Sequence, residues 1–150
     1  MLNDAGFNQP SSQLASQTIS KRAIADLLIW LGRTKWQSKW NAHDLEIESW
    51  SIGIWVKQAG IISYKDLAKW LKFISQVRGE CLKVEKKGER LCLVAGRQQQ
   101  WYAVSKSSVW QCECMLFRCR RRIAKEMPKL YEALDKKVFC HHTVAASLAG

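Results

Sequence analysis

The chain has 150 residues, 47% of them hydrophobic and 25% charged, with only two prolines and eight glycines. This length and composition exclude wholesale disorder and fibrous repeats, and they suit one compact domain with an arm. The 24 lysines and arginines exceed the 13 acidic residues by 11, and residues 1–60 account for only +1 of that excess. A basic surface beyond residue 60 is therefore expected, which implies an acidic partner such as nucleic acid unless the lysines serve only solubility.

No apolar run approaches the roughly 20 residues that a membrane span requires, and the first 30 residues lack the pattern of a secretory signal. We therefore expect an intracellular protein with no membrane contact, cytoplasmic if the host is bacterial, with the nucleus open to it if the host is eukaryotic. In a reducing compartment the six cysteines are expected to be metal ligands or buried thiols rather than disulfides.

Elements before residue 63 are assigned from composition and apolar spacing. Residues 1–17 are rich in Asn, Gln and Ser and predict a flexible arm, whereas residues 18–79 predict a helical region. A first helix runs from Ile19 to a stop at Gly32. A second is expected from the N-cap candidate Asn41 to about Gly60, although residues 51–56 are also compatible with a strand.

The third helix, over residues 63–77, has the clearest pattern. Ser63 and Asp66 form a variant of the capping box, and an apolar stripe follows at helical spacing. The order of helices followed by a hairpin also fits a winged helix-turn-helix. In that fold this helix would be the recognition helix, and the hairpin would be a wing with a basic tip. The tip residues are Lys86, Lys87 and Arg90. Packing and solvation alone explain the same residues.

After residue 80 the apolar period changes from 3.6 to 2, which predicts an antiparallel hairpin about a turn at Lys87–Gly88. The turn would set two apolar pairs on one face: Val84 opposite Leu91, and Leu82 opposite Leu93. Cys81 and Cys92 would lie diagonally on the other face, which argues against a disulfide, and both are expected to be small buried residues. Further strands are expected over 101–105 and 109–114.

The sequence then returns to helical spacing within a region that extends over residues 80–150. Residues 118–139 predict a basic helical spacer, in which Pro128 either kinks one helix or begins another. A short apolar helix is expected to begin at or near His141. The order of all these elements predicts an α+β fold, with helices first and a small antiparallel sheet after them.

Four residues have the spacing of a metal site. Cys112 and Cys114 form a C-x-C pair on the last expected strand, and Cys140 and His142 form a C-x-H pair at a helix start. Alternate residues of a strand face the same side, and a helix N-terminus tolerates a thiolate. Three sulfurs and one imidazole nitrogen make a closed tetrahedral shell, which is typical of one structural Zn²⁺ ion and leaves the site a net charge of about −1.

The segments WQCECMLF and FCHHTVAASLA, in which 25 residues separate Cys114 from Cys140, resemble the SWIM zinc finger. That family has C-x-C, a variable spacer and C-x-H on a strand pair followed by a helix. The resemblance covers residues 91–150 and implies zinc binding with a DNA-binding or protein-interaction role. It implies no catalysis in the finger. The spacer is longer and more basic than in the tightest family members.

Two other residues are candidate ligands. Cys119 would complete a four-cysteine site with Cys112, Cys114 and Cys140, and His141 would replace His142. A third alternative is that no metal binds and the cysteines are core thiols.

A basic run follows the C-x-C pair and is the candidate nucleic-acid interface. Its members are Arg118, Arg120, Arg121, Arg122, Lys125 and Lys129. The planar fork of arginine suits bidentate contact with phosphate, so this helix would lie along a nucleic-acid backbone. The alternative is a solvated helix face whose charges are balanced by nearby acidic residues.

Of the eight tryptophans, most are expected in the core, with Trp36 and Trp40 as the surface pair. No phosphate-binding loop or nucleophile signature occurs, so an enzyme is not expected. These observations predict a zinc protein that binds nucleic acid, with DNA the preferred class. The alternative is a zinc-stabilised adaptor that docks onto a protein partner in a recombination, transposition or defence complex.

Overall fold

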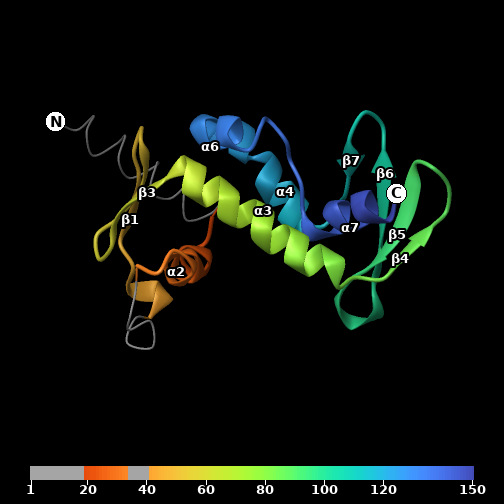
Figure 1. Ribbon diagram of the computed structural model, residues 1–150, viewed down its shortest axis with the longest axis horizontal. Coiled ribbons are helices and arrows are strands. Elements are labelled where there is room, and N and C mark those ends of the chain that lie inside the picture. The colour runs from red at the N-terminus through yellow and green to blue at the C-terminus, as the bar shows by residue number, and fades with distance from the viewer. Residues whose placement is uncertain (1–18, 34–40) are drawn as a thin grey trace. The chain divides into compact units, whose positions relative to one another are not determined.

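A computed structural model describes residues 19–33 and 41–150, and its mixed helices and antiparallel sheets confirm the predicted α+β class (Figure 1). The chain divides into two compact units. The first unit draws its described residues from Met1–Trp70 and Ile123–Asp135, and the second consists of Leu71–Arg122 and Lys136–Gly150. Each unit is therefore built from two separate stretches of chain. The predicted arm, residues 1–17, lies outside the described residues.

The first helix, α2 (Lys21–Trp30), follows its sequence signals closely. The Ser20 hydroxyl accepts a hydrogen bond from the Ala23 N–H at 3.1 Å, which satisfies one of the free donors of the first turn. The helix ends before Gly32, whose φ of +69° is the left-handed conformation that glycine adopts readily. The predicted stop at Gly32 is confirmed.

A three-stranded sheet stands where the second helix was expected, so that prediction is wrong. Asn41 does act as a cap, but only for one short 3₁₀ turn, η2 (Ala42–Asp44). Antiparallel strands then follow: β1 (Ile47–Ser49), β2 (Gly53–Val56) and β3 (Gly60–Ser63). The buried Ile54 and Val56 alternate with the half-buried Trp55, which is the period of a strand with one face in the core. The helical region expected over 18–79 therefore contains a sheet, and the two-helix start of a winged helix-turn-helix is absent from the described residues.

Helix α3 (Tyr64–Glu80) confirms the third predicted helix and extends it by three residues. The Ser63 hydroxyl accepts a hydrogen bond from the Asp66 N–H at 3.1 Å, as the capping pattern predicted. The boundary between the two units falls inside this helix.

The first unit is completed by α5 (Ile123–Glu126) and α6 (Pro128–Ala133). Pro128 occupies the first turn of α6, where a missing N–H has no consequence, so it begins a helix rather than kinking one. The region expected over 80–150 is thus divided between the two units, because part of the 118–139 spacer belongs to the first unit.

The second unit holds a four-stranded antiparallel sheet in the order β4-β5-β6-β7. Its strands are β4 (Val84–Lys86), β5 (Leu91–Ala95), β6 (Trp101–Lys106) and β7 (Trp110–Gln111). The predicted hairpin exists, but Val84 pairs with Val94 and not with Leu91. The connection is longer than two residues, and a shift by an odd number of residues exchanges the two faces of a strand. Cys92 and Val94 therefore face the core, while Leu91 is exposed.

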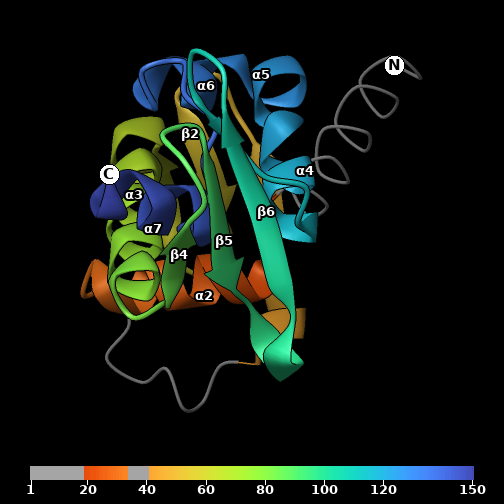
Figure 2. The ribbon, with the colours of Figure 1, turned by 90° about the vertical axis from the view of Figure 1, so that its right-hand side faces the viewer.

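Helix α7 (His141–Ala149) confirms the predicted terminal helix and packs against the strands of this sheet. Figure 2 shows β4, β5 and β6 of the sheet face on. The core of the second unit consists of nine residues: Cys92, Val94, Val104, Cys112, Cys114, Phe117, Cys140, Ala145 and Ala146. Four of the nine are cysteines, and the aliphatic side chains that pack against the cluster are only partly buried: Leu82, Val84, Leu116 and Val138.

Two expectations about burial are corrected. Cys92 is buried as predicted, but Cys81 is exposed. Among the six tryptophans that the structure describes, only Trp70 is buried, and the other five are half-buried or exposed: Trp30, Trp50, Trp55, Trp101 and Trp110. Trp36 and Trp40 lie outside the described residues. None of the described helices is both long enough and apolar enough to cross a membrane.

Candidate metal centre

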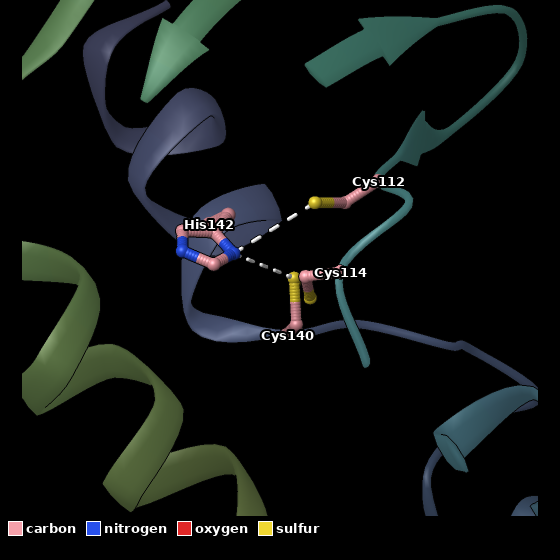
Figure 3. Close-up of side chains that lie close together, drawn as sticks. All are labelled: Cys112, Cys114, Cys140 and His142. Atoms are coloured by element: carbon pink, nitrogen blue, oxygen red, sulfur yellow. Dashed lines mark hydrogen bonds between the residues drawn. The ribbon is translucent and has the colours of Figure 1, made fainter. Parts of the chain in front are cut away.

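The four predicted ligands come together in the second unit. One donor atom from each of Cys112, Cys114, Cys140 and His142 lies within 4.8 Å of all the others, and all four residues are buried. Figure 3 shows the three sulfurs and the imidazole Nδ1 gathered about one point, from segments 26 or more residues apart in the chain. Of the ligand sets that the sequence allowed, the C-x-C and C-x-H set is therefore the one whose donor atoms lie close together.

The first pair lies where a strand gives way to a helix. Strand β7 ends at Gln111, and Cys114 already caps the next helix, α4 (Met115–Arg121). Cys114 Sγ accepts a hydrogen bond from the Phe117 N–H at 3.3 Å, which is the position a capping oxygen would take. The strand was expected to reach Cys114. Its earlier end makes the turn that points both thiols to the same place.

The second pair lies at the start of α7, as predicted. Cys140 is the N-cap, and its N–H donates to the Thr143 hydroxyl at 2.9 Å, while that hydroxyl donates to the Cys140 carbonyl at 2.9 Å. His142 follows in the first turn, with its Nδ1 at 3.7 Å from Cys112 Sγ and 3.8 Å from Cys140 Sγ. The Tyr102 ring lies 4.5 Å from the imidazole, centroid to centroid, and so helps to fix the plane of the ring.

Protons and negative charge are shared unequally within the cluster. Hydrogen bonds from Cys112 and Cys140 lower the pKa of Cys114 below its usual range, so this sulfur carries negative charge. Hydrogen bonds with Cys112 and Cys114, together with burial, raise the pKa of Cys140. Burial alone would lower the pKa of His142, but hydrogen bonds to Cys112 and Cys114 and their charges raise it to about 9. Because a metal ion binds the deprotonated forms of these side chains, it must displace the protons held by Cys140 and His142.

The donor set fits one metal ion. Three thiolates and an imidazole suit a tetrahedral ion that accepts sulfur and nitrogen. All four donors come from the protein, so the shell is closed and leaves no position for a substrate. Burial of all four residues, at 4% exposure or less, is consistent with a structural role.

The two alternative ligands are not part of the cluster that the described residues form. Cys119 lies half-buried within α4. The His141 ring lies beside that of His142, with the ring centroids 4.3 Å apart and the planes tilted by 50°. Its Nδ1 is buried without a hydrogen-bond partner in the described chain. Burial, aided by the positive charge of His142, lowers the pKa of His141 to about 4. The structure therefore selects His142 as the nitrogen ligand.

The predicted nucleic-acid residues separate into three groups. Arg118, Arg121 and Arg122 are exposed in the second unit, whereas Lys125 and Lys129 are exposed in the first. Arg120 is only 7% exposed and donates hydrogen bonds to Ser75 and to the Phe139 carbonyl. Its assignment to the nucleic-acid interface is therefore wrong, because a buried guanidinium that is already bonded cannot reach a phosphate.

Charge is concentrated in the unit that holds the cluster. The second unit has 14 basic and four acidic residues, a net charge of +10, while the first has ten and nine, a net charge of +1. The sequence showed an excess beyond residue 60, but it did not show that the excess belongs to a single compact unit.

Sequence reasoning missed the residues that support the ligands. Thr143 carried no standard signal, because the capping box has Ser or Thr at the N-cap and Glu or Gln three residues later, whereas here these positions are Cys140 and Thr143. Tyr102 had none, because its contact with His142 depends on the register of β6. No family model, curated protein or solved structure matches this chain. The interpretation of the site therefore depends on its own geometry and chemistry.

Metal affinity is expected to fall as the pH is lowered. The metal must displace protons from His142, whose pKa is raised to about 9, and from Cys140, whose pKa is also raised. In the metal-free protein the His142 proton stabilises the fold below pH 6.5, and this contribution is lost as the pH rises through about 9. Metal binding has the opposite dependence. Its affinity should rise about tenfold per pH unit for each proton displaced, hence at least about 100-fold per pH unit for the two on His142 and Cys140.

This dependence is measured by chelator competition at pH 6.5, 7.0, 7.5 and 8.0. His43, which is exposed and remote from the cluster in the chain, provides the control variant His43→Ala, whose profile should match that of the wild type. An affinity that stays constant over this range would contradict the assignment of His142 and Cys140.

Proposed function

We propose that the protein is a zinc-binding protein of the SWIM type that binds nucleic acid, with DNA the preferred class, and that it is not an enzyme. The observation that carries the proposal is the buried cluster of three cysteines and one histidine inside a unit of net charge +10. The cluster gives the unit a metal-dependent core, and the charge gives it an affinity for polyanions.

Zinc is the ion that the donor set favours. Three sulfurs and one nitrogen in a closed, buried shell are typical of structural zinc, whereas calcium and magnesium require oxygen ligands. The order of elements supports a SWIM-type unit, because the β6–β7 pair leads into Cys112 and α7 begins directly after Cys140. This is the order that the resemblance implies.

Nucleic acid is supported by the charge of the second unit. With zinc bound by three thiolates the net charge falls by one, from +10 to +9, and remains strongly positive. Arg118, Arg121 and Arg122 are exposed on or directly after α4 and are free of ion pairs among the described residues. Such arginines suit phosphate contact, which gives affinity without sequence readout.

The triple variant Arg118→Ala, Arg121→Ala, Arg122→Ala is expected to weaken binding to a DNA duplex and to reduce its salt dependence. Each phosphate contact contributes about 0.9 to the slope of log K against log salt, so the slope should fall by about 2 to 3. The measurement is fluorescence anisotropy at several salt concentrations. A matched variant removes three charges from exposed positions of the first unit: Arg22→Ala, Lys65→Ala, Lys69→Ala.

An unchanged slope in the arginine variant would remove these residues from the interface. A larger loss in the matched variant would move the interface to α2 and α3, which carry its three residues. Absence of DNA binding by the zinc-loaded wild type would overturn the nucleic-acid part of the proposal.

One observation favours the second candidate function, an adaptor for a protein partner. The sheet face away from the core carries apolar side chains that are open to solvent, with Leu91 at 40% and Trp101 at 46% exposure. Ala103 is exposed on the same face. A protein contact centred on Trp101 would be comparatively insensitive to salt, because apolar burial does not depend on counterion release. The salt series therefore distinguishes the two functions.

A further inference from the structure

Arg120 is a buried charge close to the metal-ligand segments. It lies in α4, six residues after Cys114, and only 7% of its surface is exposed. One guanidinium nitrogen, Nη1, donates to Ser75 Oγ at 2.7 Å and to the Phe139 carbonyl at 3.0 Å. The guanidinium carbon lies 5.2 Å from the centroid of the Phe139 ring. A guanidinium that is buried and already hydrogen-bonded cannot contact a phosphate, so these contacts indicate a different role for Arg120.

We propose that Arg120 is a positioning residue for the metal centre, which holds the Cys140 segment beside the Cys114 segment and supplies the positive charge that the zinc–thiolate cluster lacks. The inference rests on the proposed zinc site, and it is independent of nucleic-acid binding.

The positioning role follows from the path of the chain. After Arg122 the chain enters the first unit, and it returns to the second only at Lys136. The first ligand pair therefore precedes residues 123–135, and the second pair follows them. One ion can contact both pairs only if the two flanking segments lie side by side. The bond from Arg120 to the Phe139 carbonyl joins these two segments one residue before Cys140. Ser75 and the Phe139 ring fix the guanidinium itself.

The charge role follows from burial. Among the described residues no carboxylate lies within ion-pair distance of Arg120, and an uncompensated buried charge is strongly destabilising. Burial lowers the pKa of Arg120 to about 10, which is still well above neutral pH. The side chain therefore stays cationic at neutral pH. Zinc with three thiolates has a net charge of about −1, which one arginine neutralises.

The test compares Arg120→Met, which keeps the length of the side chain without its charge, with Arg120→Lys, which keeps the charge without the planar fork. Arg121→Met changes the exposed neighbour and is the matched control. Zn²⁺ affinity is measured by chelator competition, and the ligand geometry is followed by the absorption spectrum of the Co²⁺-loaded protein. Loss of a residue that orients metal ligands typically lowers affinity 10–100-fold. We expect that loss for Arg120→Met, a smaller one for Arg120→Lys, and wild-type affinity for Arg121→Met.

Equal Zn²⁺ affinity and an identical Co²⁺ spectrum in Arg120→Met and Arg121→Met would overturn the proposal, even if the Arg120 variant melts at a lower temperature. Should Arg120→Met fail to fold, Ser75→Ala keeps the charge and removes one support; it is expected to lower Zn²⁺ affinity several-fold, and wild-type affinity would count against the positioning role. Failure of the wild type to bind either ion is a different result, since it would remove the zinc site itself. Loss of DNA binding in Arg121→Met alone concerns only the proposed function.

Discussion

A strong chelator is expected to unfold the second unit while the first unit stays folded. The reason is the difference between their cores. Of the twelve largest fully buried side chains, ten lie in the first unit and only Val94 and Val104 in the second. The second core instead contains four cysteines and two alanines among its nine residues. Such small side chains bury little apolar area, so metal ligation has to supply much of the stability.

The expected magnitude is large. Structural zinc sites bind with apparent free energies of about 10–16 kcal/mol at neutral pH, which is comparable to the whole stability of a small domain. Hydrogen exchange measures the two units separately. Protection of amides in β4–β7 and α7 should be lost in the chelator, while protection in α2 and β1–β3 should persist.

Cysteine variants provide the matched comparison. Cys140→Ser removes one ligand and should lower Zn²⁺ affinity by more than the roughly 100-fold that loss of an outer-shell partner causes. Cys81→Ser and Cys119→Ser alter cysteines outside the cluster and should retain about one zinc per chain. A loss of metal in Cys119→Ser would show that Cys119 belongs to the metal site. If the chelator left all amides equally protected, the metal would have no structural role.

Gly79→Ala is expected to destabilise the second unit by about 1–3 kcal/mol and to weaken metal binding. Gly79 lies near the end of α3, and an added Cβ would come 3.0 Å from the His141 carbonyl oxygen and 3.2 Å from the Ala145 N. Both atoms are backbone atoms of α7, so relief of the contact would displace the turn that holds His142. In an exposed helix the same change would stabilise by up to about 1 kcal/mol. A loss of stability in Gly79→Ala would therefore show that α7 lies in close contact with Gly79, whereas a gain would contradict that contact.

Thermal unfolding of the zinc-loaded protein measures this effect, with Gln76→Ala on an exposed position of the same helix as the control. The control should change stability by less than about 0.5 kcal/mol. A Gly79→Ala protein that is more stable than the wild type would show that α7 can move away from α3 without loss.

The sequence predicted those features that depend on local spacing. The helix after Ser63 and the start of α7 follow from capping residues and apolar periods, and the four ligands follow from two short motifs. The sheet at 47–63 was missed because its strands are short, and apolar residues such as Leu45, Ile54 and Trp55 also fit a helical period. Helical and strand patterns are hard to distinguish over so few residues.

The remaining errors have a tertiary cause. The register of β4 and β5 depends on how many residues the connection uses, which the Lys87–Gly88 pair does not determine. Arg120 was indistinguishable from its neighbours Arg118 and Arg121 in the sequence, since its burial depends on Phe139, 19 residues further along. The same holds for the tryptophans, whose exposure depends on which face of a sheet they occupy.

The excursion of residues 123–135 into the first unit also constrains biosynthesis. Buried residues of that segment, such as Ile123 and Leu130, belong to the first core, while the last two ligands follow the segment. A ribosome that has translated only as far as Arg122 has therefore produced neither a complete first core nor a complete coordination sphere. Completion of the first core requires residues up to Asp135, and the proposed metal site can be complete only after His142 has emerged from the exit tunnel.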